Sequence, residues 1–219
     1  MTVLAAHQPD IFPYVGFFQK MMQSDYFDLA IYDDYAKDRY MSRVKIGRLH
    51  QLTWMNVPVV KKSKTMICDI ALKDCWRSSL QHQISKQYKH FPFFKERYYV
   101  VERVLDSDHT TLAEIGVSSI LSIKDFVGID RPKIDYLGYN LPKGQRGIGI
   151  IELVRRYRNK YDVDPLYLSG AGGHKYMDLG VFLDNGVDVR FSDPQTKWLC
   201  SALTPIFLVE NFKTAFMVL

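Results

Sequence analysis

The sequence predicts an α/β fold with a mostly parallel sheet, flanking helices and a helical insertion. Short apolar runs alternate with helical patterns at both ends of the chain, whereas residues 76–128 read as helices alone. The chain has 219 residues, of which 47% are apolar and 14% aromatic, so it can bury a large core. Its linkers are poor in Pro, Gly and Ser. We therefore predict a single domain over residues 1–219, with the insertion at about 76–128.

The first 34 residues predict a strand–helix–strand unit. Residues 2–6 form an apolar run too short for a helix, residues 14–22 fit a helix, and residues 27–32 read as a second strand. His7-Gln8 follows the first strand, and Asp33-Asp34 follows the second. Two continuous apolar strands joined through a helix are typical of a parallel sheet that is covered on both faces.

The middle of the chain changes from strands to helices. Residues 33–51 are polar and basic, and residues 52–60 and 67–72 read as strands. Helical patterns then cover residues 76–88, 92–105 and 110–126. The last helix has the clearest ends, because Thr110 or Thr111 can cap it, Glu114 suits a capping box and Gly128 follows it.

The alternation of strands and helices returns after residue 128. We predict strands at 133–136, 165–168 and 187–191, helices at 148–157, 177–184 and about 205–216, and glycine-rich loops at 138–149 and 169–174.

Composition excludes several classes of protein. The aromatic content excludes a disordered chain, and the net charge of +5 permits an anionic partner without demanding nucleic acid. Three unclustered cysteines do not suggest a disulfide framework, and we predict no metal ligands. The N-terminal residues do not resemble a signal peptide, and no apolar run reaches the ~18 residues of a membrane span. We expect a soluble, cytoplasmic protein.

Polar residues follow three of the predicted strands: His7-Gln8, Asp33-Asp34 and residues 169–174. Ligands of open parallel sheets bind beyond the carboxyl ends of the strands, so adjacent strands would bring these clusters into one site. His7 could act as acid or base or stabilise phosphate charge, and Gln8 could bind a carbonyl or phosphate. Asp33 and Asp34 could contact ribose or an amine, act as a general base or bind magnesium. The alternative for each is a structural role at a strand end or turn.

The glycine-rich loop and a basic segment are candidates for phosphate binding. Ser169, Gly170, Gly172, Gly173 and His174 join a predicted strand to a helix, where backbone N–H groups and the helix N-terminus favour an anion. The alternative is a simple turn with a solvated His174. A second candidate is a basic strip, which could bind a diphosphate or an acidic carrier protein or could be a solvated loop. Its members are Lys37, Arg39, Arg43 and Lys45.

These motifs resemble those of the WbqC-like family. The first block reads His7-Gln-Pro-Asp-Ile-Phe-Pro-Tyr-Val-Gly-Phe-Phe-Gln-Lys20, and Ser24-Asp25, Asp33-Asp34, Lys37 and a looser match at Arg43 follow. Later, Tyr167-Leu-Ser-Gly170 with Gly172, Gly173 and Tyr176 is similar to the family pattern YLSGxGGxxY. Tyr14 stands where the family usually has Trp, and the tail after Trp198 departs from the family pattern.

The resemblance implies a role in surface-polysaccharide or natural-product biosynthesis, with an acyl or aminoacyl group transferred to an amino sugar. We predict a phosphate-bearing substrate such as a sugar nucleotide, an acyl thioester or acyl-adenylate donor, and an acyl-carrier protein as a candidate partner. His7, or Asp33 with Asp34, would accept the proton of the attacking amine.

Two other functions stay open at this stage. The order of elements is similar to the adenylate-binding fold of nucleotidyltransferases and pantothenate synthetase, although the chain lacks their second histidine. An ATP-dependent ligase or nucleotidyltransferase that uses ATP at the same site is therefore an alternative. The other alternative is a non-catalytic module that binds a carrier protein or nucleic acid. Of these two partners, we do not expect nucleic acid.

Overall fold

The computed structural model describes residues 1–36, 39–60, 65–143 and 147–217. The chain divides into two compact units, and each unit is built from separate stretches of sequence. Unit 1 contains Met1–Gln8, Lys20–Tyr32 and Arg131–Pro194, and unit 2 contains Pro9–Gln19, Asp33–Asp130 and Gln195–Leu219.

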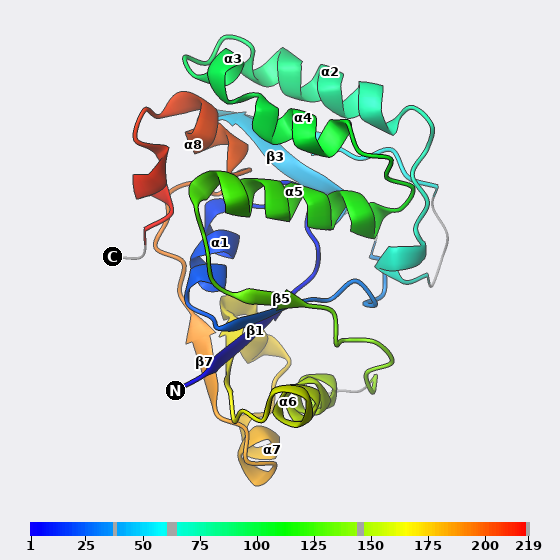
Figure 1. The fold of residues 1–219 in the computed structure, drawn as a ribbon, viewed down its shortest axis with the longest axis vertical. Coiled ribbons are helices and arrows are strands. Elements are labelled where there is room, and N and C mark those ends of the chain that lie inside the picture. The colour runs from blue at the N-terminus through cyan, green and yellow to red at the C-terminus, as the bar shows by residue number, and fades with distance from the viewer. Residues whose placement is uncertain (37–38, 61–64, 144–146, 218–219) are drawn as a thin grey trace. The chain divides into compact units, whose positions relative to one another are not determined.

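Unit 1 contains a five-stranded sheet in which every neighbouring pair of strands is parallel (Figure 1). The strands lie in the order β5-β2-β1-β6-β7. Their bounds are β1 Val3–His7, β2 Tyr26–Leu29, β5 Lys133–Asp135, β6 Leu166–Gly170 and β7 Val189–Ser192. The predicted α/β class with a mostly parallel sheet is confirmed, and all five strands were predicted near their observed positions.

The strand β2 ends at Leu29 rather than at Tyr32. The N–H of Ala30 still donates to the carbonyl oxygen of His7 on β1, at 2.9 Å. The N–H of Ile31 then donates back to the carbonyl oxygen of Leu29 at 2.7 Å, which is a three-residue turn. The turn takes the chain out of the sheet before it reaches Asp33.

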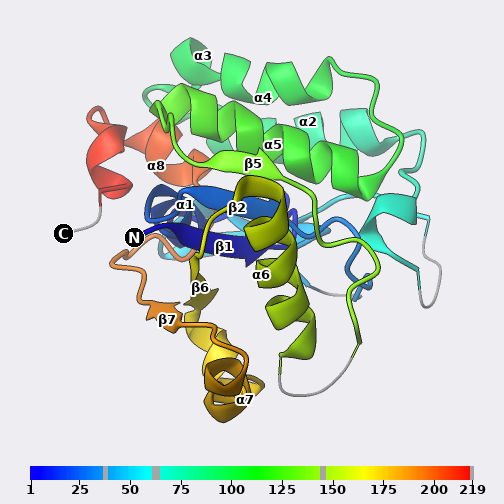
Figure 2. The same cartoon turned by 60° about the horizontal axis from the view of Figure 1, so that its bottom comes forward.

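Two helices, α6 Ile148–Tyr161 and α7 Leu179–Asp184, lie on the same side of this sheet (Figure 1). Figure 2 shows α6 running across the strands β1 and β2. Leu4 and Tyr167 of the sheet pack in one cluster with Val154 and Tyr157 of α6 and Phe182 of α7. Fully burying a large apolar side chain contributes roughly 1.5–3 kcal/mol, so this cluster is a main source of stability in unit 1.

Unit 2 contains an antiparallel hairpin of β3 Arg43–Arg48 and β4 Gln51–Asn56. The sequence predicted a polar segment where β3 lies, and a strand over 52–60 that is longer than β4. Val44 and Ile46 are buried, whereas Arg43 and Lys45 alternate with them along β3. This alternation is that of a strand with one solvated face, and the abundance of basic residues concealed it.

The helices of unit 2 follow the predicted helical block. They are α2 Trp76–Tyr88, α3 Phe94–Arg97, α4 Tyr99–Leu105, α5 Leu112–Val127 and α8 Leu203–Leu208, with short 3-10 helices η1 Ile67–Asp69 and η3 Phe212–Ala215. The helix α1 Val15–Met22 starts in unit 2 and ends in unit 1. The predicted ends of α5 are confirmed: Thr111 and Glu114 form a capping box, and Gly128 adopts the left-handed conformation, with φ of 82°.

Three predictions in unit 2 were wrong in detail. The predicted strand at 67–72 begins instead as η1, because Ile70 donates back to Ile67 at 3.3 Å, and only Ala71 and Leu72 make isolated bridges. The predicted helix at 92–105 is divided into α3 and α4 at Tyr98. The predicted tail helix is divided into α8 and η3, because the chain is extended at Val209, with φ of −109° and ψ of 131°.

Within the described ranges, no helix has the length and apolar character needed to cross a membrane.

Candidate active site at the strand ends

The order in which the chain adds strands to the parallel sheet reverses between β1 and β6. Counted in chain order, its strands lie third, second, first, fourth and fifth across the sheet. The chain therefore adds β2 and β5 on one side of β1, and later adds β6 and β7 on the other side. In doubly wound folds, ligands bind beyond the carboxyl ends of the strands at such a switch point. The fold thus directs attention to the ends of β1 and β6.

The structure brings two of the three predicted clusters to this switch point. His7 is the last residue of β1, and Gly170 is the last residue of β6. The two strands are paired as far as Ala5 and Leu168, and the same register places His7 level with Gly170. The prediction that these strand ends adjoin is confirmed. We refer to His7, Gln8, Ser169, Gly170 and Gly172 as the strand-end site.

Asp33 and Asp34 are not at the end of a strand of this sheet. Both belong to unit 2, where the carbonyl oxygen of Asp33 accepts a hydrogen bond from the N–H of Ile67 at 2.9 Å. Asp34 forms an isolated antiparallel bridge with Met66. The predicted placement directly after β2 was wrong, because the chain turns at Leu29 before it reaches them. Their catalytic role stays a prediction.

The environment of His7 keeps its imidazole neutral. Its Nδ1 lies 3.0 Å from the carbonyl oxygen of Gln8, and because a carbonyl can only accept, Nδ1 carries the proton. Nε2 is then the basic nitrogen. Burial and, to a smaller extent, the nearby Lys20 ammonium lower the pKa of His7 from 6.5 to about 4. At neutral pH the ring is therefore in the form that can accept a proton.

Lys20 is a polar residue of this region that the sequence reasoning did not select. Its Nζ donates to the carbonyl oxygen of Ala6 at 2.7 Å, and its side chain is only 5% exposed. Burial lowers the pKa of Lys20 from 10.5 to about 8. Lys20 ends the first family-like motif, but it stands near the end of a short apolar helix, where a lysine is ordinarily solvated, so spacing alone did not single it out.

The glycine-rich loop folds into a 3-10 helix, η2 Ala171–Lys175, directly after β6. An added Cβ would meet no atom within 4 Å at Gly170 or Gly172, so the backbone is open at both positions. At Gly173 a Cβ would collide with the Ser169 hydroxyl, Met177 and Phe191, so this glycine is required for packing. The phosphate-binding proposal is therefore strongest for Gly170 and Gly172.

Two other parts of the loop prediction need correction. The loop does not lead directly into an α-helix, because α7 begins only at Leu179. The carboxylate of Asp178 caps that helix by accepting from the N–H of Gly180 at 3.1 Å, so an anion already occupies its N-terminus.

His174 is exposed and stacks on Phe191 with ring centroids 3.4 Å apart. Ser169 is buried and donates to the carbonyl oxygen of Gly170 at 3.2 Å.

A family model supports the assignment suggested by these motifs. The model of the WbqC-like protein family matches residues 8–202, which is most of the chain. The chain belongs to the WbqC-like family. No curated protein matches it. The match begins directly after β1 and extends past β7, so it includes residues of both units.

The basic strip of this WbqC-like chain is a cluster of cations around one aromatic ring. The guanidinium carbon of Arg43 lies 4.3 Å from the centroid of Trp54, and Nζ of Lys45 lies 5.5 Å from it. Trp54 is 40% exposed. Arg39 is exposed, and Lys37 lies outside the described residues. The face of the hairpin thus presents Arg43 and Lys45, while the proposed role of Lys37 has no structural description.

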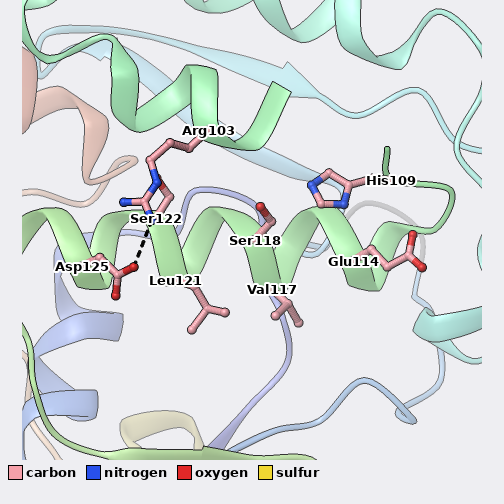
Figure 3. A pocket seen from close by; sticks show the side chains of 8 residues that line it. All are labelled: Arg103, His109, Glu114, Val117, Ser118, Leu121, Ser122 and Asp125. Atoms are coloured by element: carbon pink, nitrogen blue, oxygen red, sulfur yellow. Dashed lines mark hydrogen bonds and ion pairs between the residues drawn. The ribbon is translucent and has the colours of Figure 1, made fainter. Parts of the chain in front are cut away.

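A hollow in this WbqC-like chain lies along α4 and α5 in unit 2, with a volume of about 440 Å³ (Figure 3). Its charged groups have structural partners: Arg103 pairs with Asp125 at 3.2 Å, and Glu114 accepts the capping bonds of α5. The ring of His109 lies 5.9 Å from that of Trp76. The groups that line the hollow therefore stabilise the helices, and we place the candidate site at the strand ends.

One buried carboxylate in unit 1 has a structural role. Asp28 of β2 is fully buried, and its Oδ2 accepts from the N–H of Leu137 at 2.6 Å and from the hydroxyl of Tyr157 at 3.1 Å. Burial and this carboxylate raise the pKa of Tyr157, which keeps the phenol protonated. Asp28 therefore fixes α6 and the segment after β5 against the sheet.

Proposed function

We propose that this protein is an acyl- or aminoacyl-transferring enzyme that forms an amide on an amino-sugar nucleotide or a related small molecule. The observation that carries the proposal is the position of His7 at the topological switch point, beside the open backbone at Gly170 and Gly172. The family to which the chain belongs is linked to surface-polysaccharide biosynthesis, which supports a sugar acceptor. The acyl donor would be a thioester.

In the proposed reaction, the amine nitrogen of the sugar attacks the acyl carbon of the thioester. Nε2 of His7 accepts the proton that the amine loses, the C–S bond breaks, and the imidazolium returns the proton to the departing thiolate. The neutral state of His7 suits the first of these steps. Holding donor and acceptor together can supply roughly 7–11 kcal/mol of the barrier, so no covalent enzyme intermediate is required.

The other residues of the strand-end site would position the substrates. The side-chain amide of Gln8 can donate to a carbonyl or phosphate oxygen, and it follows His7 directly. The backbone at Gly170 and Gly172 is open enough for a phosphate group to approach closely. On the hairpin, Arg43 remains a candidate contact for an acidic carrier protein that delivers the acyl group.

The test is an amide-forming assay with nucleotide-linked amino sugars and acyl thioesters, read by mass spectrometry. We expect the wild-type protein to produce the acylated sugar. His7→Gln, which keeps a polar side chain without a basic nitrogen, should lower kcat by roughly 10²–10⁴-fold. His50→Gln, an exposed histidine of unit 2, is the matched control and should leave kcat unchanged. Full activity of His7→Gln would remove the proposed base.

An ATP-dependent ligase is a second candidate, because the strand order of this sheet also occurs in nucleotide-binding folds. The same assay separates the two reactions when free carboxylic acid and ATP replace the thioester. Release of AMP or pyrophosphate that depends on the amine would favour the ligase, and transfer from the thioester without ATP would favour the transferase.

A further inference from the structure

The ammonium group of Lys20 lies at the place where β1 and β6 adjoin. The carbonyl oxygen of Thr2 accepts from Leu166 on the β6 side, and carbonyls along a strand alternate in direction. The carbonyl oxygen of Ala6 therefore points to the same side. Pairing between the strands ends one residue earlier, at Ala5 and Leu168. Lys20 Nζ, at 2.7 Å from the Ala6 oxygen, thus stands at the switch point itself.

Among the described residues, no anion neutralises this buried cation. In the part of the chain that the structure describes, the ammonium of Lys20 has no ion pair, and the Ala6 carbonyl is its one hydrogen-bond acceptor. An ammonium has three N–H donors, so two are left for a ligand. Buried charges are normally paired, because an unpaired one loses its hydration without compensation. Burial accounts for the lowered pKa of Lys20, with no carboxylate acting to raise it.

We propose that Lys20 is the anion-binding group of the strand-end site and that its ammonium binds a phosphate group of the ligand. The inference rests on the proposed function only in placing a ligand at the ends of β1 and β6. It names the phosphate, rather than the sugar or the acyl group, as the part that Lys20 recognises. The open backbone at Gly170, on the adjoining strand end, would accommodate the same phosphate.

A phosphate at Lys20 would also change the basicity of His7. The ammonium of Lys20 is one of the causes that lower the pKa of His7. An anion bound to Lys20 offsets that positive charge, so the pKa of His7 rises when the ligand is present. The catalytic base would then be strongest in the loaded site, which links phosphate recognition to proton transfer without any movement of the backbone.

The experiment titrates the full chain with inorganic pyrophosphate, by calorimetry and by NMR of the histidine side chains. We expect wild-type protein to bind pyrophosphate and the pKa of His7 to rise from about 4 on saturation. Lys20→Met, which keeps the aliphatic stem, should bind at least about tenfold more weakly. Lys86→Met, at an exposed lysine of α2, is the matched control and should bind as the wild type does.

The inference is overturned if Lys20→Met binds pyrophosphate as tightly as the wild type. It is also overturned if the wild-type His7 pKa does not move on saturation, a measurement that needs no variant and therefore stands if Lys20→Met does not fold. Lys20→Gln provides a second variant that can still donate to Ala6. Binding that depends on Lys20, without acyl transfer, would contradict the proposed function and leave this inference standing.

Discussion

Burial has opposite effects on two residues that stand three positions apart, His7 and Asp10. It lowers the pKa of His7 to about 4 and raises the pKa of Asp10 to about 7, so burial favours the uncharged form of both. The sequence pattern identified His7 as a candidate from its place after a strand. It gave no indication of Asp10, because the burial of an aspartate in a loop depends on residues that are distant in sequence.

The two pKa shifts predict opposite pH dependences of stability. Asp10 binds a proton more tightly in the folded state, so its contribution to the free energy of unfolding falls as pH rises from about 4 to about 7. His7 binds a proton more tightly in the unfolded state, so stability rises between about 4 and 6.5. Relative to wild type, Asp10→Asn should gain stability with rising pH, and His7→Gln should lose it.

Urea denaturation at several pH values measures these slopes, which can reach about 1.4 kcal/mol per pH unit for one proton. A constant offset between variant and wild type reflects lost packing, so the slope alone carries the prediction. Parallel curves for Asp10→Asn and wild type across this range would show that Asp10 is ionised normally in the folded protein.

The glycines of the loop predict a contrast between two similar substitutions. Gly173→Ala places a Cβ against Ser169, Met177 and Phe191, and should lower the free energy of unfolding by roughly 1–3 kcal/mol. Gly172→Ala meets open space and should leave stability nearly unchanged, while weakening pyrophosphate binding if phosphate approaches the backbone there. Thermal and urea unfolding of both variants test the first part. Equal stability of the two variants would contradict the described packing.

Among helices and strands, the sequence predicted an element's ends best where local interactions alone determine them. The ends of α5 were predictable because the capping box and the left-handed Gly128 are local interactions. The end of β2 was not, since it depends on a turn at Ile31 that carries no distinctive residue. The strand β3 was also missed, because the cations Arg43 and Lys45 on its solvated face concealed the alternation.

The capping box of α5 gives a prediction at this level. Thr111→Ala removes the side-chain oxygen that accepts from the N–H of Glu114 at 3.3 Å. Loss of such a cap typically costs about 1 kcal/mol, so the free energy of unfolding should fall by that amount. Thr110→Ala is the matched control. It removes a hydroxyl that donates to the Glu114 carboxylate, but the backbone N–H of residue 110 still donates to that carboxylate. A loss as large in the control as in Thr111→Ala would count against a specific capping role.

For the whole molecule, the sequence predicted the position of the strand-end site better than it predicted which cation lies there. The α/β pattern and the polar residues after β1 and β6 were sufficient to bring His7 and Gly170 together. The net charge of +5 suggested an anionic partner, and the predicted basic strip drew attention to Arg43 and Lys45. The cation at the strand ends is instead Lys20, whose burial follows from the tertiary structure and could not be deduced from spacing.

The location of the positive charge predicts how binding responds to salt. A protein that binds single-stranded nucleic acid releases condensed counterions, so log K falls with log salt with a slope of about −0.7 for each phosphate contacted. Pyrophosphate has no such counterion atmosphere, and Lys20 is shielded from solvent, so its affinity should fall only shallowly between about 50 and 200 mM salt. Calorimetry with pyrophosphate and fluorescence anisotropy with a labelled oligonucleotide compare the two. Tight oligonucleotide binding with a steep slope that is lost in Arg43→Gln would identify the hairpin as a nucleic-acid surface, against the small-ligand function proposed for this chain.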